Sequence, residues 1–492
     1  MTSHALPHAD RALADLTLRV RDDLDRISHP RRPWTFAHDA PSGGTMLDVL
    51  IVGGGQSGLA AAFGLMRDEV RNILVVDQAP RGLEGPWLSY ARMHTLRSPK
   101  DFTGPDLDIP SLTYQSWHEA KFGPESWTAL HLITKQDWVD YLLWLRDAVG
   151  IPVQNDTTVL DIEPCEGGLC VVLSMMGGEP VRRYARKVVL ATGQESLGRW
   201  SMPGFVEALP PQVRAHTAEG IDFAALRGKR VAILGAGASA FDNAATALEA
   251  GAGEVHLFCR RAEPQLVQPY LWLTFTGFLK HFSELDDVWK WRFMNYILGL
   301  REGFPQPTWD RCAKHMNFRL HTAAGWSGAR MEGDRVVLET AKGPLEADYV
   351  ICATGIEHNP AQRPELARAA GNIARWEDRF TPAPDEQNNR LSAFPYLGND
   401  YTLQERVPGQ TPWLRNIHLF SIAATMSFGP SGSSINAMKF SVPKLVSGIT
   451  GGLFRDDVEA YWQDLRSYDI RQAELRWPEG HPMTLSLMKQ DA

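Results

Sequence analysis

Two glycine-rich turns, each placed directly after a short apolar run, restrict this chain to a small set of folds. The first apolar run, LDVLIV, leads into GGGQSGLAAA, so Gly53, Gly55 and Gly58 follow the spacing G-x-G-x-x-G. In this pattern the first glycine permits a tight turn and the second lets backbone N–H groups approach a pyrophosphate. The third glycine lets the following helix pack on the strand. The sequence therefore predicts a βαβ unit that holds a dinucleotide at the N-terminus of a helix.

The strand after this turn carries a second part of the same signature. The run NILVV ends in Asp77, 24 residues after Gly53. A carboxylate at the end of this strand suits the two ribose hydroxyls of an adenosine. The alternative, a glycine-rich turn in a βαβ unit that binds nothing, does not account for the acid at this place.

A second copy of the pattern lies almost two hundred residues later. The run RVAIL leads into GAGASAF, so Gly235, Gly237 and Ala240 fit G-x-G-x-x-A. The next strand, VHLFC, ends in Arg260 and Arg261 where an acid would bind a free ribose. Cations at this point suit a 2′-phosphate, so the second site is predicted to prefer NADPH to NADH. The alternative is a pair of solvated arginines at a strand end.

Two further apolar strands each end in Ala-Thr-Gly. They are KVVLATG and DYVICATG, one before the second glycine-rich turn and one after the segment that follows it. Small residues at a strand end let the backbone turn and pass close to a dinucleotide. The two triplets are Ala191, Thr192 and Gly193, and Ala353, Thr354 and Gly355.

Composition and charge exclude several classes of protein. A net charge of −8 argues against nucleic acid as a partner, because phosphate binding needs a basic face. The five cysteines show no disulfide framework, which fits a reducing cytoplasm. The first thirty residues lack the apolar run of a signal peptide, and no uncharged run is long enough for a transmembrane span. No Ser/His/Asp arrangement and no metal-ligand spacing occurs, so we expect no metal site and a small-molecule substrate.

The order of these motifs resembles the two-dinucleotide-binding flavoproteins, over roughly residues 45–450. The resemblance is strongest to the flavin-containing monooxygenase-like (class B) group, which includes N-hydroxylating enzymes, Baeyer–Villiger enzymes and flavoproteins similar to the cation-efflux-associated CzcO. It implies an α/β fold with two Rossmann-like domains, in which an NADPH domain interrupts a discontinuous FAD domain. Gly85, Pro86 and Trp87 stand where this family usually has a Gly-Gly-x-Trp-like segment beside the flavin.

The resemblance divides the chain into five parts. They are an N-terminal helical extension (1–45), the first part of the FAD domain (46–200), an NADPH domain (201–350) with an aromatic-rich insert (262–330), the second part of the FAD domain (351–455) and a C-terminal helical tail (456–492). The insert holds thirteen aromatic side chains and exceeds what a minimal NADPH domain requires. A lid over the substrate, a homodimer surface and a membrane-surface contact are its three candidate roles, in that order.

The chain departs from the family pattern at two places, and it also carries a cysteine pair that we interpret as incidental. His216 occupies the histidine position of the family fingerprint F-x-G-x-x-x-H, but the Phe and Gly positions are Pro210 and Gln212. His216 is therefore either the fingerprint residue or a surface histidine. His94 stands where Baeyer–Villiger enzymes carry an aspartate, which counts against ester formation. Cys165 and Cys170 have the spacing of a redox disulfide, yet the segment EPCEGGLCVVLS is typical of a β-hairpin.

The remaining candidate residues come from two segments that skirt the flavin in related proteins. Residues 92–117 are polar and proline-rich and are predicted to form a long ordered loop, whose side chains contact flavin or substrate. Its candidate catalytic residues are Arg97, Ser98, Lys100 and Asp101. Near the C-terminus, the segment PSGSSINAMKF opens a helix whose N-terminal amides face the flavin, with Ser433 or Ser434 as its N-cap.

The complete set of predicted cofactor contacts follows from these motifs. For FAD it comprises Gly53, Gly55, Gln56, Ser57, Gly58, Asp77, Gln78, Trp87, Ser433 and Ser434. For NADPH it comprises Gly235, Gly237, Ala238, Ser239, Ala240, Arg260 and Arg261. The two triplets, Ala191, Thr192 and Gly193, and Ala353, Thr354 and Gly355, are predicted to pass close to a dinucleotide.

Three hypotheses of function follow from the resemblance. The first is an FAD- and NADPH-dependent monooxygenase that transfers one oxygen atom from O₂, through a C4a-(hydro)peroxyflavin, to a small amine or sulfide, as in N-hydroxylation. The second is a Baeyer–Villiger monooxygenase acting on a ketone, and the third is an NADPH-dependent oxidase or electron-transfer flavoprotein. In all three the cofactor carries the hard chemistry, and the protein binds, orients and excludes water.

Overall fold

The computed structural model describes residues 4–431, 434–478 and 481. The chain forms two compact units, Met1–Gly451 and Gly452–Ala492. The larger unit contains most of the long helix α15 (Met438–Asp456), and the smaller unit contains the helix α16 (Val458–Ser467). Within the described ranges, none of the helices combines the length and the apolar character that crossing a bilayer requires.

The first sheet of the larger unit is built around the first glycine-rich turn. It has seven strands, with β1 (Leu47–Val52) between β2 (Ile73–Val76) and β6 (Val181–Leu190) in parallel register. The strand β3 (Val153–Gln154) lies beyond β2, while β5 (Gly168–Met175) and β4 (Thr157–Cys165) continue the sheet beyond β6. The helix α2 (Gln56–Arg67) follows β1 directly and is buried along most of its length, as expected for a βαβ unit.

A strand from the far end of the unit completes this sheet. The strand β17 (Ile417–Leu419) pairs in parallel with β6, joining Ile417 to Val188. The sheet is thus assembled from two parts of the chain that lie on either side of the second sheet in sequence. This confirms the predicted α/β class with one dinucleotide-binding domain interrupted by another.

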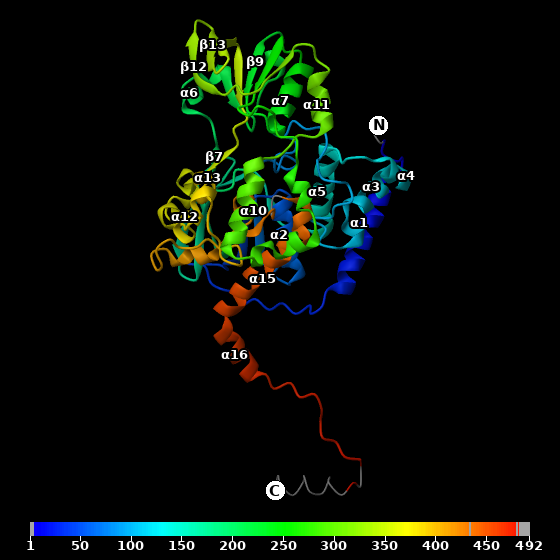
Figure 1. The fold of residues 1–492 in the computed structure, drawn as a ribbon. Helices are drawn as coiled ribbons and strands as arrows, with labels where there is room; N and C mark the ends of the chain where they lie inside the picture. The colour runs from blue at the N-terminus through cyan, green and yellow to red at the C-terminus, as the bar shows by residue number, and fades with distance from the viewer. Residues whose placement is uncertain (1–3, 432–433, 479–480, 482–492) are drawn as a thin grey trace. The chain divides into compact units, whose positions relative to one another are not determined.

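The second sheet contains the second glycine-rich turn. Its five parallel strands have the order β11-β10-β9-β15-β8, in which β9 (Arg230–Leu234) is central. The other strands are β8 (Arg214–His216), β10 (Glu254–Phe258), β11 (Phe318–His321) and β15 (Tyr349–Cys352). The helix α7 (Ala238–Glu249) packs on one face of the sheet beside α11 (Gln306–Ala313) (Figure 1). A three-stranded antiparallel sheet, β12 (Trp326–Glu332), β13 (Arg335–Thr340) and β14 (Gly343–Ala347), contributes to the core on the other face.

Two short strands join the two sheets. The strand β7 (Gly198–Trp200) leaves the first sheet and β16 (Ile356–His358) returns to it, and the two pair antiparallel. A Cβ atom built on Gly198 would lie 1.7 Å from the carbonyl oxygen of Glu357, so only glycine fits at this contact. The short helix α6 (Gly204–Glu207) follows β7.

Four helices from the N-terminal part of the chain pack against one another. The helix α1 (Ala9–Ile27) buries Leu16 and Val20, in agreement with the predicted N-terminal helix. It packs on α3 (Tyr114–Phe122), which is followed by α4 (Pro124–Ala129) and α5 (Lys135–Val149). The predicted long loop is therefore partly wrong, because α3 begins inside it. The cause is the Thr113 N-cap, whose hydroxyl accepts the backbone N–H of Ser116 at 3.2 Å.

The aromatic insert forms a core of its own with the C-terminal part of the chain. Its helices are α8 (Pro269–Trp272), α9 (Thr276–His281) and α10 (Asp287–Leu300). Buried Phe278, Phe282 and Trp291 pack in one apolar cluster with Trp376 and Met426. The latter two belong to α12 (Trp376–Arg379) and α14 (Thr425–Phe428), and α13 (Asn389–Ser392) adds Leu391 to the same cluster. The insert therefore packs on the segment that contributes β17 to the first sheet.

Candidate active site

The first glycine-rich turn has the geometry of a pyrophosphate cradle. Gly53 has φ +109°, and a Cβ atom there would lie 2.4 Å from the carbonyl oxygen of Ala191. A Cβ atom on Gly58 would lie 1.8 Å from the carbonyl oxygen of Gly53, so the helix packs directly on the turn. Gly55 differs, because a Cβ atom there would meet only Gly85, at 3.8 Å. The backbone at Gly55 is therefore open to the close approach of a phosphate at the N-terminus of α2.

Asp77 is held for hydrogen bonding at the end of β2. One carboxylate oxygen accepts the backbone N–H of Gly54 at 2.6 Å and the other accepts that of Ala79 at 2.7 Å. Burial raises the pKa of Asp77, and these two hydrogen bonds partly oppose that effect. Each oxygen retains a lone pair that is free to accept a ribose hydroxyl. Gln78, the next residue, is exposed.

Other residues around this turn fit a bound flavin nucleotide. The indole N–H of Trp87 is buried without a hydrogen-bond partner among the described residues, and it lies beside Gly85. Such an orphaned donor fits a ligand that supplies the acceptor. Gln56 and Ser57 are buried in the first turn of α2, and the side-chain amide oxygen of Gln56 accepts the indole N–H of Trp138 at 3.3 Å.

The second glycine-rich turn repeats this geometry. Gly235 has φ +121°, and a Cβ atom there would lie 2.5 Å from the carbonyl oxygen of Ala353. Gly237 is the N-cap of α7, and a Cβ atom on it would meet no atom within 4 Å. Ala238 and Ala240 are buried in the first turn of α7, while Ser239 is exposed. The second dinucleotide site is thus open at the same glycine as the first.

Each Ala-Thr-Gly triplet contacts the first glycine of one of these turns. Ala191 and Ala353 each present a carbonyl oxygen to the first glycine of a turn. The hydroxyl of Thr192 donates to the carbonyl oxygen of Ser196 at 3.4 Å, and that of Thr354 donates to the carbonyl oxygen of Ser201. Gly193 and Gly355 have φ of +61° and +85°, conformations that favour glycine.

The two arginines after β10 have different surroundings. Arg261 donates to the carbonyl oxygens of Leu300 at 2.9 Å and Gly299 at 2.7 Å, so it caps the C-terminal end of α10. Arg260 is exposed, and its aliphatic part lies over Gly325. The structure therefore gives Arg261 a helix-capping contact and leaves the Arg260 guanidinium open to a phosphate.

The four candidate catalytic residues do not converge on one point. Arg97 donates to the Asp242 carboxylate at 2.6 Å and lies 3.5 Å from that of Glu302. Lys100 donates to the carbonyl oxygen of Trp127 at 2.6 Å, with its ammonium 4.7 Å from the centre of that indole ring. Ser98 is half-buried and Asp101 is exposed.

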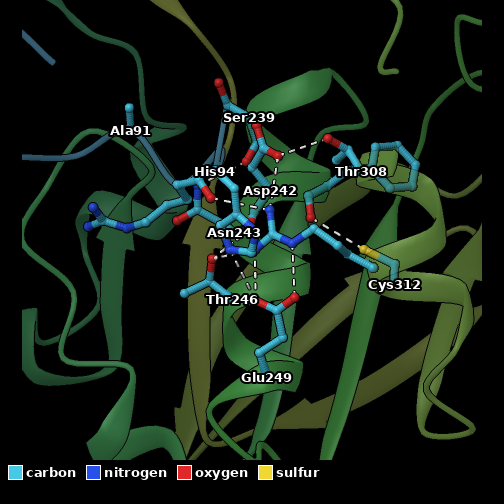
Figure 2. Close-up of polar contacts among 12 residues, drawn as sticks. Ala91, His94, Ser239, Asp242, Asn243, Thr246, Glu249, Thr308 and Cys312 are labelled. Carbon is cyan, nitrogen blue, oxygen red and sulfur yellow. Dashed lines mark hydrogen bonds and ion pairs between the residues drawn. The ribbon is translucent and has the colours of Figure 1, made fainter. Parts of the chain in front are cut away.

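Arg97 is part of a polar network that joins the loop 89–97 to the second sheet's helices. Figure 2 shows Asp242, Glu249 and Thr308 of this network. Asp242, on α7, also accepts the Thr308 hydroxyl at 3.1 Å and lies 3.5 Å from the guanidinium of Arg311, both on α11. Arg311 in turn binds Glu249 through two hydrogen bonds of 2.9 and 2.8 Å. It also donates to the carbonyl oxygen of Arg92 at 3.2 Å, which ties the loop to α11.

The two histidines singled out in the sequence differ in burial. His216 is 1% exposed, and its ring stacks on Trp200 with the ring centres 5.2 Å apart. It is therefore not a surface histidine, and burial lowers its pKa to about 4. His94 is exposed and lies 3.8 Å from the Glu249 carboxylate.

The C-terminal segment begins its helix as predicted but without the predicted cap. Ser434 is the N-cap of a short 3₁₀ turn, Ile435–Ala437, that leads into α15, yet its hydroxyl contacts the side chain of Asn436 and no backbone N–H. Ser433 lies outside the described residues. Asn436 also donates to the hydroxyl of Thr274 at 3.2 Å, which links this turn to the insert. Sequence reasoning missed Asn436, Thr274 and Glu302, because their partners are distant in sequence.

Cys165 and Cys170 lie on a β-hairpin and are both free thiols. Cys165 pairs with Gly168 across the turn, and Cys170 pairs with Glu163. The remaining cysteines, Cys259, Cys312 and Cys352, are buried and free. This agrees with the predicted hairpin.

Two dinucleotide sites on an interrupted α/β fold define a two-dinucleotide-binding flavoprotein, and comparisons with known proteins agree. A family model described as pyridine nucleotide-disulphide oxidoreductase matches residues 50–280. The FAD-dependent urate hydroxylase of Xanthomonas campestris pv. campestris is 40% identical over 469 residues, covering 95% of this chain and 98% of that protein. The chain therefore belongs to the same family as this hydroxylase, and it is an FAD-containing flavin-dependent monooxygenase.

Solved structures share the fold at low sequence identity. The ornithine hydroxylase of Pseudomonas aeruginosa superposes with a TM-score of 0.65 at 16% identity, covering 84% of this chain and 99% of that one. The bacillithiol disulfide reductase of Staphylococcus aureus superposes with a TM-score of 0.55 at 16% identity, covering 83% and 99%. Because one neighbour is a hydroxylase and another a reductase, the fold alone does not select the reaction.

Proposed function

We propose that this chain is an NADPH-dependent FAD monooxygenase that hydroxylates urate or a closely related oxidised purine. The observation that carries the proposal is the 40% identity, over nearly the full length of both chains, to a urate hydroxylase. The two dinucleotide sites add support, because such an enzyme must hold a flavin and a nicotinamide nucleotide together. The predicted amine or sulfide substrate is thereby replaced by a purine ring as the first candidate.

The reaction must balance one molecule of O₂ against two electrons from NADPH. One oxygen atom enters the substrate as a hydroxyl group, and the other leaves as water. The overall reaction consumes the hydride of NADPH, which supplies the two electrons, and one proton from solvent. FAD, when bound, accepts the hydride and activates O₂. The protein's own part is to hold the two nucleotides, orient the substrate and keep water out of the cleft.

Specific residues are assigned to these tasks. Asp77 binds the adenosine ribose of FAD, and the N-terminus of α2 binds its pyrophosphate. The N-terminus of α7 binds the pyrophosphate of NADPH, and Arg260 binds its 2′-phosphate. Residues 46–200 and 351–455 form the FAD domain in this proposal, and residues 201–350 form the NADPH domain.

Arg97 has a positioning role in this proposal. Its ion pair with Asp242 joins the loop beside the flavin site to the helix that starts at the second glycine-rich turn. A fixed α7 holds the hydride donor at a fixed distance from the flavin, which is where orientation affects rate most strongly. Ser98, Lys100 and Asp101 have no such contact across the two sheets among the described residues.

Product analysis of the FAD-loaded enzyme tests the proposal. Purified protein is mixed with NADPH, O₂ and urate, and the consumption of NADPH, urate and O₂ is followed together with peroxide release. Urate-dependent NADPH oxidation, with one urate lost per NADPH and little peroxide, is the expected result. NADPH oxidation that ignores urate and yields stoichiometric peroxide would favour an oxidase and refute the proposal.

A panel of further compounds tests amine, sulfide and ketone oxygenation. Ornithine, lysine, cadaverine, an organic sulfide and a cyclic ketone are offered under the same conditions. Coupled turnover of an amine or sulfide would restore the first hypothesis from the sequence, and an ester product would favour Baeyer–Villiger chemistry. The CzcO-like grouping, a homodimer and a cytoplasmic location stay predictions from the sequence.

A further inference from the structure

Three arginines, Arg261, Arg301 and Arg390, lie at the C-terminal end of α10. The carbonyl oxygens of Gly299 and Leu300 accept hydrogen bonds from Arg261, and that of Leu298 accepts one from Arg390 at 3.0 Å. Arg301 follows as the C-cap with φ +71°. Arginines at a helix C-terminus satisfy orphan carbonyls and the negative end of the helix dipole, which explains Arg261 and Arg390 as anchors.

Arg301 is not explained in this way. Its side chain is exposed and makes no hydrogen bond or ion pair with any residue that the structure describes. Arg301 lies within electrostatic reach of Arg260, Arg261 and Arg390. None of these four guanidinium groups has a carboxylate partner within the described part of the chain. Glu302, the adjacent acid, lies within electrostatic reach of Tyr270 and 3.5 Å from the guanidinium of Arg97.

Neutral polar groups surround the same point. Tyr270 lies within electrostatic reach of both Arg301 and Arg390, and its ring packs on the apolar cluster of the insert. Burial raises the pKa of Tyr270, so its hydroxyl stays a neutral hydrogen-bond donor at neutral pH. His358, near Arg390, packs on Phe394 with ring centres 4.0 Å apart, and burial lowers its pKa to about 4. Neither group offsets the positive charge.

This cluster is connected to both segments that skirt the flavin in the proposed function. The carbonyl oxygen of Tyr270 accepts the hydroxyl of Thr274 at 2.8 Å, and that hydroxyl accepts Asn436 at 3.2 Å. On the other side, Glu302 joins the cluster to Arg97 on the loop. The cluster therefore lies between the loop 89–97 and the turn that opens α15.

We propose that Arg301 and Arg390, together with the Tyr270 hydroxyl, form the subsite that binds an anionic group of the substrate. The inference rests on the proposed function, since urate is an anion at neutral pH and carries planar oxygen and nitrogen acceptors. A guanidinium group donates in a planar fork that matches such acceptors, and a tyrosine hydroxyl adds a third donor. Binding of the anion also compensates positive charge, because Glu302 is the one acid near the cluster in the described residues and it is shared with Arg97.

The 2′-phosphate of NADPH is the competing anion, because Arg260 and Arg261 lie near Arg301. Titration of the oxidised FAD-loaded enzyme separates the two ligands. Urate binding is measured without nucleotide, by the change in the flavin absorption spectrum, and NADP⁺ binding is measured without urate. We expect Arg301→Gln to raise the urate Kd about 10- to 100-fold, the usual effect of a hydrogen bond to a charged group. The NADP⁺ Kd should change less than about 2-fold.

Controls keep the outcome interpretable. Arg183→Gln removes an exposed arginine on β6 and should leave both dissociation constants unchanged. Arg301→Lys should retain part of the urate affinity, because a point charge replaces the fork. Arg301 bonds to no described residue, so Arg301→Gln is expected to fold with an unchanged melting temperature. An unchanged urate Kd in Arg301→Gln, or a rise confined to NADP⁺, would overturn the inference.

A second arm is independent of urate. Inorganic sulfate at constant ionic strength should raise the melting temperature of the wild-type holoenzyme and have a smaller effect on Arg301→Gln. If wild-type enzyme fails to bind urate but shows this sulfate difference, the proposed function fails and the anion subsite stands. Equal sulfate effects on the two proteins would refute the subsite itself.

Discussion

The ion pair between Arg97 and Asp242 offers the sharpest test of how the two sheets are held together. The Asp242 side chain is 4% exposed and that of Arg97 is 28% exposed, with 2.6 Å between the charged atoms. Removing one partner of a fully buried pair costs about 3–5 kcal/mol. Asp242 keeps the Thr308 hydroxyl at 3.1 Å and Arg311 at 3.5 Å. We therefore expect Arg97→Met to lower the free energy of unfolding by about 1.5–3 kcal/mol, the value of one charge-assisted hydrogen bond.

A double-mutant cycle isolates this contact from other effects. Arg97→Met, Asp242→Asn and the double variant are unfolded in urea as FAD holoenzymes, and flavin release is followed by fluorescence. All variants are unfolded under one protocol, and only differences between them are used for the coupling energy, because a chain with several domains need not unfold in one step. Arg330→Met, which breaks an exposed pair with Glu339, is the matched control and should cost less than about 1 kcal/mol.

The same variants test the positioning role. Stopped-flow mixing with NADPH measures flavin reduction, and mixing of the reduced enzyme with O₂ measures reoxidation. Arg97→Met should slow reduction about 10- to 100-fold, the effect of a misplaced reacting group, and leave reoxidation nearly unchanged. A stability loss no greater than that of Arg330→Met, together with normal reduction, would refute the reasoning.

Three further predictions concern single residues. Asp77→Ala should weaken FAD binding by about 1.5–3 kcal/mol, measured by fluorescence titration of the apoprotein, and full flavin retention would contradict the assignment. Arg260→Ala should raise the NADPH Michaelis constant and spare that of NADH, whereas Arg261→Ala should chiefly lower the melting temperature, because Arg261 caps α10; equal effects on both nucleotides would count against this division. His216 has a folded pKa of about 4, below its ordinary value of 6.5, so stability is full above pH 6.5 and falls as pH drops toward 4; His216→Gln should flatten that part of the curve by roughly 3 kcal/mol.

The glycine-rich turns can be predicted because their signal is local. Gly53 and Gly58 touch each other, so short-range spacing contains the geometry of this turn. The Ala-Thr-Gly strands are recognisable in the sequence, but their contacts are not. The carbonyl oxygens of Ala191 and Ala353 face Gly53 and Gly235, from positions more than a hundred residues away in sequence.

Side-chain partners across the two sheets cannot be predicted, because the partners are distant in sequence. Arg97 and Asp242 are separated by 145 residues, and Arg261 reaches carbonyl groups 38 and 39 residues away. A strand-end arginine has the same sequence pattern whether it binds a phosphate or caps a helix. The Thr113 cap of α3 is visible in the sequence, since Thr113 precedes a helical stretch, but the surrounding prolines favour a loop.

Specificity in this chain must reside mainly outside the two dinucleotide sites. The first sheet and its turn serve a hydroxylase and a disulfide reductase alike among the solved neighbours, so neither feature selects a substrate. The insert is different, because Thr274 joins Tyr270 of the insert to Asn436 in the turn that opens α15. Its packing on Trp376 and Met426 fixes these side chains relative to the first sheet. A change of substrate by mutation should therefore be sought in the insert, where a side chain can change without disturbing either nucleotide.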